Sequence, residues 1–393
     1  MMKAPGIVGS FFKKASHYFE IPITKTKATK TKVRPEKLVE TKTDRPDFDA
    51  TLASLAELLV EYFLGMGVPP DAVEMYKKCL LINTQGGKLH RCWTVLDTAQ
   101  TLQCGGLTTA QTKDLMVLGW LVEILNAGYL IWDDIMDGSL TRRGKPCWYR
   151  REEIGLMSIN DACLLTSSVF VVLKTHFKNH PAYHDLVDMF RETALQIEIG
   201  QSYDLLTASK DYGGLSQFTR DKYNFIIERK TAYYTSYTPL ALPLVYLQLA
   251  TPRNLSELYR VALSLGQYYQ VRNDYLDVFG DPEVTGKAGS DIQENKLTWL
   301  VLEALERCDE DQKKVLKTFY GSSDDEGVAK VLAVFVELDL DHVYQVWKQK
   351  KIAAIRKLIE SVDESEGLNR DVFNVFLSKL EGDRMRKVGV LAN

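Results

Sequence analysis

Apolar residues recur at spacings of three and four along most of the chain, which is the pattern of helices that bury one face. The pattern begins at about Phe48, and convincing runs of alternating apolar and polar residues are absent. Clear examples are Leu52, Leu55, Leu58, Leu59 and Phe63; Leu118, Leu121, Val122, Leu125 and Tyr129; and Val328, Val331, Leu332, Phe335 and Leu338. Prolines are few and most stand at expected helix ends. We therefore predict one all-α domain over residues 46–393 with roughly ten or more helices.

The first 45 residues have a different composition. Residues 1–35 hold seven lysines and one arginine against a single acidic residue, and residues 24–32 are made of threonine, lysine and alanine. Such a stretch cannot bury enough apolar surface to fold by itself. It is also basic, rich in hydroxyl groups and poor in acids, as organelle transit peptides are. We predict a basic disordered tail at 1–45 of a cytoplasmic protein, with a mitochondrial transit peptide as the alternative.

Charge, cysteines and hydropathy exclude several classes of protein. The net charge is −3, and residues 1–35 carry +7, so the other 358 residues carry −10 and are not expected to bind nucleic acid. Six cysteines are scattered without a C-x-x-C pair, which favours reduced thiols inside a cell over a zinc site or a disulfide framework. No apolar run reaches the roughly 18 residues of a membrane span. We therefore predict no membrane span.

Three carboxylates close an apolar helical stretch that runs from Leu118 to Trp132. They are Asp133, Asp134 and Asp137. Residues four apart share a helix face, so Asp133 and Asp137 point the same way and repel each other unless a cation lies between them. Oxygen ligands clustered in this way suit Mg²⁺. A solvated acidic helix end has the same pattern, so this segment alone does not decide.

A second acidic segment repeats the spacing about 140 residues later, again at the end of an apolar helical stretch. It consists of Asn273, Asp274 and Asp277. Two such helix ends that face each other could hold a cluster of metal ions. The cluster would bind a diphosphate and stabilise it as a leaving group.

Basic residues accompany the two segments, as a diphosphate site requires. Guanidinium groups match the geometry of phosphate oxygens, and a glycine-rich stretch with basic residues, here residues 86–91, can cradle a phosphate. The candidates are Arg142, Arg143, Lys230, Lys287, Lys88 and Arg91. Each of them taken singly is more often a surface charge, so the argument rests on the set.

These residues resemble the trans-isoprenyl diphosphate synthases, specifically their farnesyl diphosphate synthase branch. The first aspartate-rich motif of that branch is matched nearly throughout by residues 133–149, DDIMDGSLTRRGKPCWY, and residues 274–296 resemble the second motif. Gly200-Gln201 with Asp204, and Lys230-Thr231, also match. The resemblance covers about residues 49–387. It implies an isoprenoid synthase-type helical bundle with a central cavity, three Mg²⁺ ions, a prenyl diphosphate substrate and a homodimer.

The resemblance also implies a role for each candidate residue. The ligands of Mg²⁺ would be Asp133, Asp137 and Asn273, supported by Asp134, Asp274 and Asp277. The allylic diphosphate would be bound by Arg142, Lys230 and Lys287. The reacting carbons would lie near Lys230, Thr231 and Gln270. The diphosphate of the second substrate, isopentenyl diphosphate, would be bound by Lys88, Arg91 and Arg143.

Several positions depart from the family pattern. Asn273 replaces the aspartate that usually begins the second motif, as in many terpene synthases. Asn126 stands where the family has glutamine, His90 where it has asparagine, and residues 384–393 run past the usual basic tail. The last three changes fall around the pocket for isopentenyl diphosphate. Gly128 stands where chain-length-limiting enzymes carry a bulky residue, and we expect it to open the floor of the cavity.

These departures favour a terpene synthase that ionises farnesyl diphosphate and releases a sesquiterpene hydrocarbon or alcohol, with little or no chain elongation. The alternative is a farnesyl diphosphate synthase, a prenyltransferase that condenses isopentenyl diphosphate with dimethylallyl or geranyl diphosphate. The retained Lys88, Arg91 and Arg143 support that alternative. A non-catalytic, regulatory relative is disfavoured, because the metal and allylic diphosphate residues are nearly complete.

Overall fold

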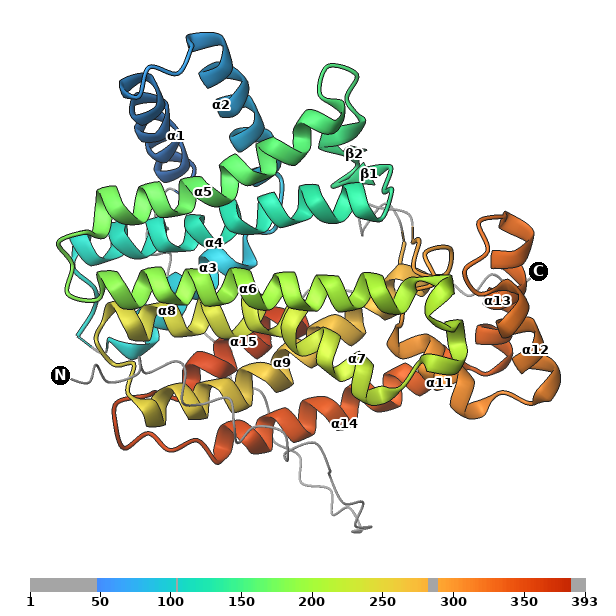
Figure 1. Cartoon of the computed structure of the whole chain (residues 1–393). Coiled ribbons are helices and arrows are strands. Elements are labelled where there is room, and N and C mark those ends of the chain that lie inside the picture. Colours follow the sequence, from blue (N-terminus) through green and yellow to red (C-terminus); the bar gives the residue numbers. More distant parts are fainter. Residues whose placement is uncertain (1–47, 104, 282–288, 383–393) are drawn as a thin grey trace, which may run out of the picture. The chain divides into compact units, whose positions relative to one another are not determined.

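The computed structural model describes residues 48–103, 105–281 and 289–382, and this part of the chain is built of helices (Figure 1). The helices of its first half are α1 Phe48–Gly65, α2 Pro70–Thr84, α3 His90–Leu102, α4 Thr109–Met136, α5 Ser158–Phe177 and α6 Tyr183–Ala208. Those of the second half are α7 Arg220–Ile226, α8 Thr238–Tyr246, α9 Pro252–Phe279, α11 Trp299–Arg307, α12 Glu310–Phe319, α13 Asp325–Glu337, α14 Leu340–Glu360 and α15 Asp371–Gly382. The prediction of an all-α fold is confirmed.

Shorter elements connect these helices. The only strands among the described residues form a two-stranded hairpin after α4, in which β1 pairs with β2 in antiparallel register. The strands are β1 Thr141–Arg142 and β2 Lys145–Pro146. The 3₁₀ turns are η2 Trp148–Arg150, η3 Gly155–Met157, η4 Lys210–Tyr212 and η5 Gly214–Gln217, and η6 Ile227–Tyr237 is a π-helix.

Helix α4 carries the first acidic segment at its C-terminal end. The helix begins with a capping box in which the Thr108 side chain accepts from the Gln111 backbone, and the Gln111 side chain accepts from Thr108 in return. Its central 18-residue apolar window is 83% buried. Trp120 anchors it to α1, because its indole Nε1 donates to the Phe48 carbonyl at 2.8 Å. A rigid, buried helix therefore holds the acids in place.

Helix α9 carries the second acidic segment, and the π-helix η6 lies between α9 and α6. The backbones approach so closely that glycine is required on both sides. A Cβ on Gly200 of α6 would lie 2.2 Å from the backbone nitrogen of Lys230, and one on Gly266 of α9 would lie 2.3 Å from the Ala232 Cβ. The π-helix is thereby fixed against the two helices that border the site.

Two hydrophobic cores support this arrangement. The larger core gathers side chains from α1 to α6, α8, α9, α14 and α15, and the smaller one gathers side chains from α7, α9 and α11 to α14. Both cores include residues of α9 and η6, so the site elements stand where the cores meet. The five cysteines that the structure describes are all free.

Some predictions fall outside the described residues. The basic tail 1–45, Lys287 and the C-terminal residues 383–393 are among them, so their assignments stay predictions. The absence of a membrane span also stays a prediction. Two helical segments, Thr109–Met136 and Gly155–Phe177, are long and apolar enough to cross a membrane, although a buried core helix passes the same test.

Candidate active site

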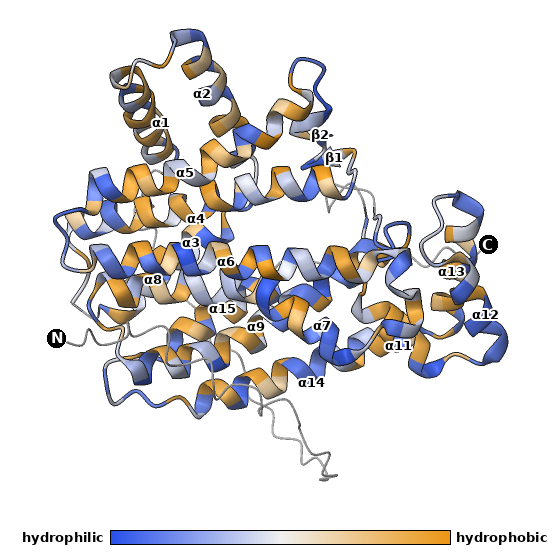
Figure 2. Cartoon of the chain, viewed as in Figure 1, coloured by the Kyte–Doolittle hydropathy of each residue, from blue (hydrophilic) through white to orange (hydrophobic). Residues whose placement is uncertain are grey.

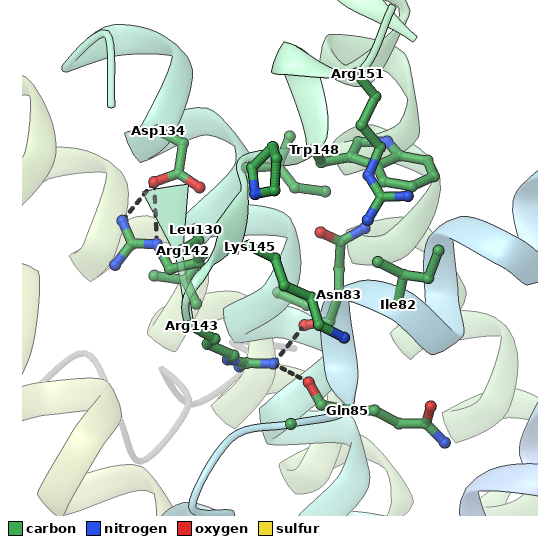
Figure 3. A pocket seen from close by; sticks show the side chains of 14 residues that line it. Ile82, Asn83, Gln85, Leu130, Asp134, Arg142, Arg143, Lys145, Trp148 and Arg151 are labelled. Atoms are coloured by element: carbon green, nitrogen blue, oxygen red, sulfur yellow. Dashed lines mark hydrogen bonds and ion pairs between the residues drawn. The ribbon is translucent and has the colours of Figure 1, made fainter. Parts of the chain in front are cut away.

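The carboxylates of the first acidic segment are paired with basic side chains. Asp134 is 3% exposed, and its Oδ1 accepts from Arg142 Nε at 3.0 Å and Nη2 at 2.5 Å (Figure 3). The Asp133 Oδ1 accepts from Gln201 Nε2 at 3.1 Å and lies 3.3 Å from Lys230 Nζ. The sequence-predicted residues Asp133, Asp134, Arg142 and Lys230 thus come together in one site.

Two lysines, the buried Lys296 and the half-buried Lys230, join this segment to α6 through Asp204. Lys296 Nζ donates to Asp137 Oδ1 at 2.7 Å and to Asp204 Oδ2 at 3.2 Å. Lys230 Nζ donates to the same Asp204 oxygen at 2.7 Å. No role was predicted for Asp204 or Lys296, although both lie in stretches that match the family motifs.

Burial and neighbouring charges set the protonation of these groups. Burial opposes ionisation of Asp133, but Lys230, Arg142 and Lys296 together hold its pKa well below the usual range. Burial and the Asp133 charge raise the pKa of Asp137 to about 6, although Lys296 acts against them. Burial would lower the pKa of Lys230, but the surrounding carboxylates raise it well above the usual value. The neighbouring cations hold Asp133 in its ionised form, which is the form that can bind a metal ion.

The second acidic segment is held differently. Asp274 is 3% exposed and accepts three hydrogen bonds, from the Tyr223 hydroxyl, from Gln270 Nε2 at 2.8 Å and from the Trp299 backbone nitrogen at 2.8 Å. Burial raises the pKa of Asp274 to about 6, although these donors act in the opposite direction. Asp274 therefore supports the fold around the site, and its oxygens are already occupied.

The other two residues of this segment lie nearer the surface. Asn273 is exposed. Asp277 Oδ2 accepts from the Asp291 backbone nitrogen at 3.0 Å, and Gly289 approaches the Asp277 carbonyl so closely that a Cβ would lie 1.8 Å from its oxygen. Asp277 thereby fixes the chain that follows the second segment. Within residues 48–103, 105–281 and 289–382, no three His, Cys, Asp or Glu side chains already converge in a geometry that would hold a metal ion.

The π-helix connects the two acidic segments. Thr231 Oγ1 donates to Gln270 Oε1 at 2.6 Å, and Gln270 in turn donates to Asp274. Thr231 follows Lys230, which contacts Asp133. A chain of contacts therefore runs from the first segment through Lys230 and Thr231 to the second. The structure brings the predicted catalytic residues together, while their roles stay predictions.

A second group of cations lies beside α3 and the hairpin. Arg91 Nη2 donates to the Tyr234 hydroxyl at 2.9 Å and to Thr235 Oγ1 at 3.0 Å, and its guanidinium lies over the Tyr234 ring, 4.4 Å from the centroid. A Cβ on Gly87 would lie 3.1 Å from Arg143 Nη2, so this glycine lets the loop of Lys88 approach the hairpin. Of the residues predicted for the second diphosphate, the structure places Arg143 beside the loop that carries Lys88, and the Arg91 charge acts on Arg143.

The charges of this group influence one another. Burial lowers the pKa of Arg143, and the nearby cations Arg142 and Arg91 lower it further, while Glu123 opposes them. Glu123 is 4% exposed, and its charge also acts on Arg91. Glu123 was not predicted as a site residue. The only available signal was a charged residue in the middle of a long apolar helix.

The expectation for Gly128 is wrong. A Cβ at this position would lie 2.8 Å from Thr166 Cγ2 and 3.1 Å from the Ala162 carbonyl oxygen, both on α5. The space left by the missing side chain is therefore filled by α5 and does not enlarge a cavity. The neighbouring Tyr129 reaches α6, where its hydroxyl donates to Glu198 Oε1 at 2.8 Å.

Comparison with known proteins decides the family. A sequence profile described as polyprenyl synthetase matches residues 73–338. The chain belongs to the polyprenyl synthetase family. It is 41% identical over 336 residues to the farnesyl pyrophosphate synthase of Schizosaccharomyces pombe, covering 86% of this chain and 97% of that protein. The bovine farnesyl pyrophosphate synthase is 38% identical over 318 residues, 81% of this chain and 90% of the relative.

The fold agrees with this assignment. The solved structure of Trypanosoma brucei farnesyl diphosphate synthase complexed with risedronate has a TM-score of 0.78 and 32% sequence identity to this chain. The match covers 84% of this chain and 97% of that structure. The isoprenoid synthase helical fold and the resemblance to the farnesyl diphosphate synthase branch are thereby confirmed.

The expectation of a terpene synthase, a lyase, is wrong. Curated relatives from S. pombe, Kluyveromyces lactis and Saccharomyces cerevisiae all carry the name farnesyl pyrophosphate synthase, a prenyltransferase. The physical reason for the error lies in the second group of cations. Asn126 and His90 are single departures from the family pattern, whereas Arg91 and Arg143 are both retained, and the Arg91 charge acts on Arg143.

Proposed function

We propose that the protein is a prenyltransferase that condenses isopentenyl diphosphate with dimethylallyl or geranyl diphosphate to form farnesyl diphosphate. The presence of two groups of partly buried cations carries the proposal. Lys230 and Arg142 surround the first acidic segment, whereas Arg91 and Arg143 stand beside α3 and the hairpin. Ionisation of one diphosphate needs a single such group. Condensation needs two, because two diphosphates must be bound at once.

The donor set of the first segment fits Mg²⁺, on which prenyltransferases of this family depend. Asp133 and Asp137 present carboxylate oxygens four residues apart at the end of a buried helix, and Asp133 is held ionised. We assign these two residues and Asn273 as ligands, with three ions as the number to be tested. When bound, Mg²⁺ neutralises the departing diphosphate and so lowers the barrier to breaking the carbon–oxygen bond.

The chain's own residues then divide the work. Lys230 and Arg142 bind and orient the allylic diphosphate, while Arg91 and Arg143 hold isopentenyl diphosphate so that its double bond faces the allylic carbon. Thr231, linked to Gln270, borders the reacting carbons and excludes water from them. One carbon–carbon bond forms, one carbon–oxygen bond breaks, and one diphosphate and one proton leave. No redox partner is needed.

The test is a product assay with Mg²⁺. Incubation with isopentenyl and dimethylallyl diphosphates should give farnesyl diphosphate, detected as farnesol after phosphatase treatment. Farnesyl diphosphate supplied alone should give no volatile hydrocarbon. Arg91→Gln should raise the KM for isopentenyl diphosphate at least about tenfold and leave the KM for the allylic substrate within about threefold. A protein that forms no C10 or C15 product from C5 substrates would contradict the proposal.

We also propose that the protein is a homodimer in which α5 is covered by the partner. Only 39% of the most apolar window of Gly155–Phe177 is buried, against 83% for α4. Large apolar side chains remain exposed there, Met157 and Ile159 among them, and Figure 2 shows hydrophobic residues along much of α5. Ile159→Glu should yield monomers in analytical ultracentrifugation. The control Val336→Glu, at another exposed apolar residue, should not change the mass.

A further inference from the structure

A pocket lies between the end of α2, the end of α4 and the hairpin (Figure 3). Its cavity volume is about 80 Å³, and the pocket is partly open to solvent. Of the residues that line it, four are basic and one, Asp134, is acidic. Neither Lys88 nor Arg91 lines it, whereas Gly86 and Arg143 do, so it lies beside the residues assigned to isopentenyl diphosphate and shares Arg143 with them.

The positive charge of this pocket is only partly neutralised. Asp134 is already bound by Arg142. Arg143 Nη1 donates to two backbone carbonyls, of Asn83 at 3.1 Å and Gln85 at 2.5 Å, which carry no formal charge. The remaining cations, Lys145 and Arg151, have no acidic partner inside the pocket.

The surroundings of Arg151 suit the binding of an anion. Its guanidinium lies over the Trp148 ring, 5.0 Å from the centroid, and its Nε is buried without a hydrogen-bond partner among the described residues. The Glu153 carboxylate interacts electrostatically with Arg151, but it already forms an ion pair with Lys78 at 3.2 Å. A buried guanidinium nitrogen without an acceptor costs free energy unless an anion supplies one.

The rest of the lining is apolar. Ile82 of α2, Leu130 and Ile131 of α4, and Trp148 form walls beside the basic groups. In Figure 3, Arg151 and Trp148 lie at the top of the pocket and Arg143 at its bottom, with Lys145 between them. The natural complement of such a lining is a phosphate group that carries a short hydrocarbon chain.

We propose that this pocket is a third isoprenoid-binding site, which takes a small prenyl phosphate of about five carbons. The proposal rests on the proposed function, since that reaction supplies isopentenyl diphosphate as the available compound of this class. An anion bound there competes with the Asn83 and Gln85 carbonyls for Arg143 and draws this side chain away from the substrate pocket. High concentrations of isopentenyl diphosphate should therefore inhibit condensation.

Binding can be measured without catalysis by equilibrium dialysis with radiolabelled isopentenyl diphosphate in EDTA, because the metal-dependent allylic site is then empty. The wild-type protein should bind two molecules per chain, with a weaker second site. Lys145→Gln and Arg151→Gln should each raise the Kd of the second site at least about tenfold and leave the first unchanged. The control Lys330→Gln, which also removes a cation lying over an aromatic ring, should bind like wild type.

Two further comparisons distinguish a prenyl phosphate from a simple anion, and this site from the proposed prenyltransferase function. Unlabelled inorganic diphosphate should displace the label from the second site less well than isopentenyl phosphate does, since it lacks the hydrocarbon; equal displacement overturns the prenyl assignment. A single site in wild type, or two sites that neither variant alters, overturns the site itself. Two sites in a protein without condensation activity would refute the proposed function and leave this site standing.

Discussion

The two acidic segments share one spacing but have opposite surroundings. At the end of α4, each carboxylate contacts a cation: Asp133 lies near Lys230, Asp134 binds Arg142, and Asp137 binds Lys296. At the end of α9, Asp274 instead accepts from uncharged donors, including the Trp299 backbone. The same i, i+1, i+4 pattern therefore produces a charged cluster in one place and a neutral hydrogen-bond network in the other.

From this difference we expect a catalytic role for the acids of α4 and a structural role for Asp274. The cations near Asp133 hold it ionised, and they are groups that a diphosphate can also bind, so a metal–diphosphate complex could exchange partners with them without leaving buried charge unpaired. Asp274 has no such freedom, because its three donors are fixed parts of the fold. We expect substitutions in the first segment to reduce catalysis, and those at Asp274 to reduce stability.

The largest effect is expected at the first segment. Asp133→Ala removes a ligand that activates the diphosphate, and the loss of several kcal/mol of transition-state stabilisation should lower kcat/KM roughly a thousandfold or more. Steady-state kinetics at saturating Mg²⁺ would measure it, and EDTA should abolish the activity of the wild type. Asp188→Ala, at an exposed acid of α6, serves as the control. Activity of Asp133→Ala within tenfold of wild type would exclude the metal assignment.

The next largest effect is expected on stability at Asp274. Asp274→Ala leaves the Tyr223 hydroxyl, the Gln270 amide and the Trp299 N–H without their acceptor. Unsatisfied buried donors cost about 1–3 kcal/mol each, and partial relaxation should leave a total loss of about 2–4 kcal/mol. Urea unfolding in EDTA would measure the loss without interference from metal binding. An unchanged midpoint would show that Asp274 is not a structural acceptor.

The comparison of the α4 and α9 regions also applies to lysine side chains. Lys351 contacts α9, whereas Lys230 lies near the acids of α4. The Lys351 Nζ donates to Gln267 Oε1 at 2.5 Å, and burial lowers its pKa to about 8. By contrast, Lys230, near the α4 acids, has a pKa raised well above the usual value. A lysine whose folded pKa lies below its unfolded value destabilises the fold below that folded pKa, and the cost disappears as the pH rises toward about 10.5.

Lys351→Met should therefore stabilise the protein at pH 7 by about 1–2 kcal/mol, which is less than the full shift implies because the side chain retains some exposure. The gain should shrink as the pH rises above about 8 and vanish near 10.5. Urea unfolding across this range would measure it. Lys350→Met, at the exposed neighbour, should change stability by less than about 0.5 kcal/mol. A destabilised Lys351→Met protein would show that the amine is well compensated.

Much of this organisation could be predicted from the sequence, because apolar spacing fixes which helix face is buried. The patterns around Leu52, Leu118 and Val328 fall in α1, α4 and α13. The acidic segments were found for a similar reason, since a spacing of four places side chains on one face. The cationic partners of the α4 acids were predicted only in part, because Lys296 reaches Asp137 across 159 positions of the chain.

Other features could not be predicted because they depend on what packs against a residue. Spacing cannot tell which of two adjacent residues points inward, so it did not separate buried Asp274 from exposed Asn273. A missing side chain indicates space only if nothing fills it, and α5 fills the space beside Gly128. The wrong functional expectation has a similar origin, because a single departure such as Asn126 does not show that the retained Arg91 and Arg143 lie close enough for their charges to interact.

The smallest effect is expected at Asn273, which tests whether the second acidic segment contributes a ligand to the metal. Asn273 is exposed, so Asn273→Asp should leave the free energy of unfolding within about 0.5 kcal/mol of wild type. The new carboxylate adds one negative charge to the second segment, which at present contributes a neutral carbonyl. We expect the Mg²⁺ concentration for half-maximal activity to fall about threefold to tenfold, equivalent to about 1 kcal/mol, while kcat stays within about threefold. A titration of activity against Mg²⁺ would measure the shift. If the requirement for Mg²⁺ does not change, Asn273 is not a ligand, and the α4 segment holds the metal without help from α9.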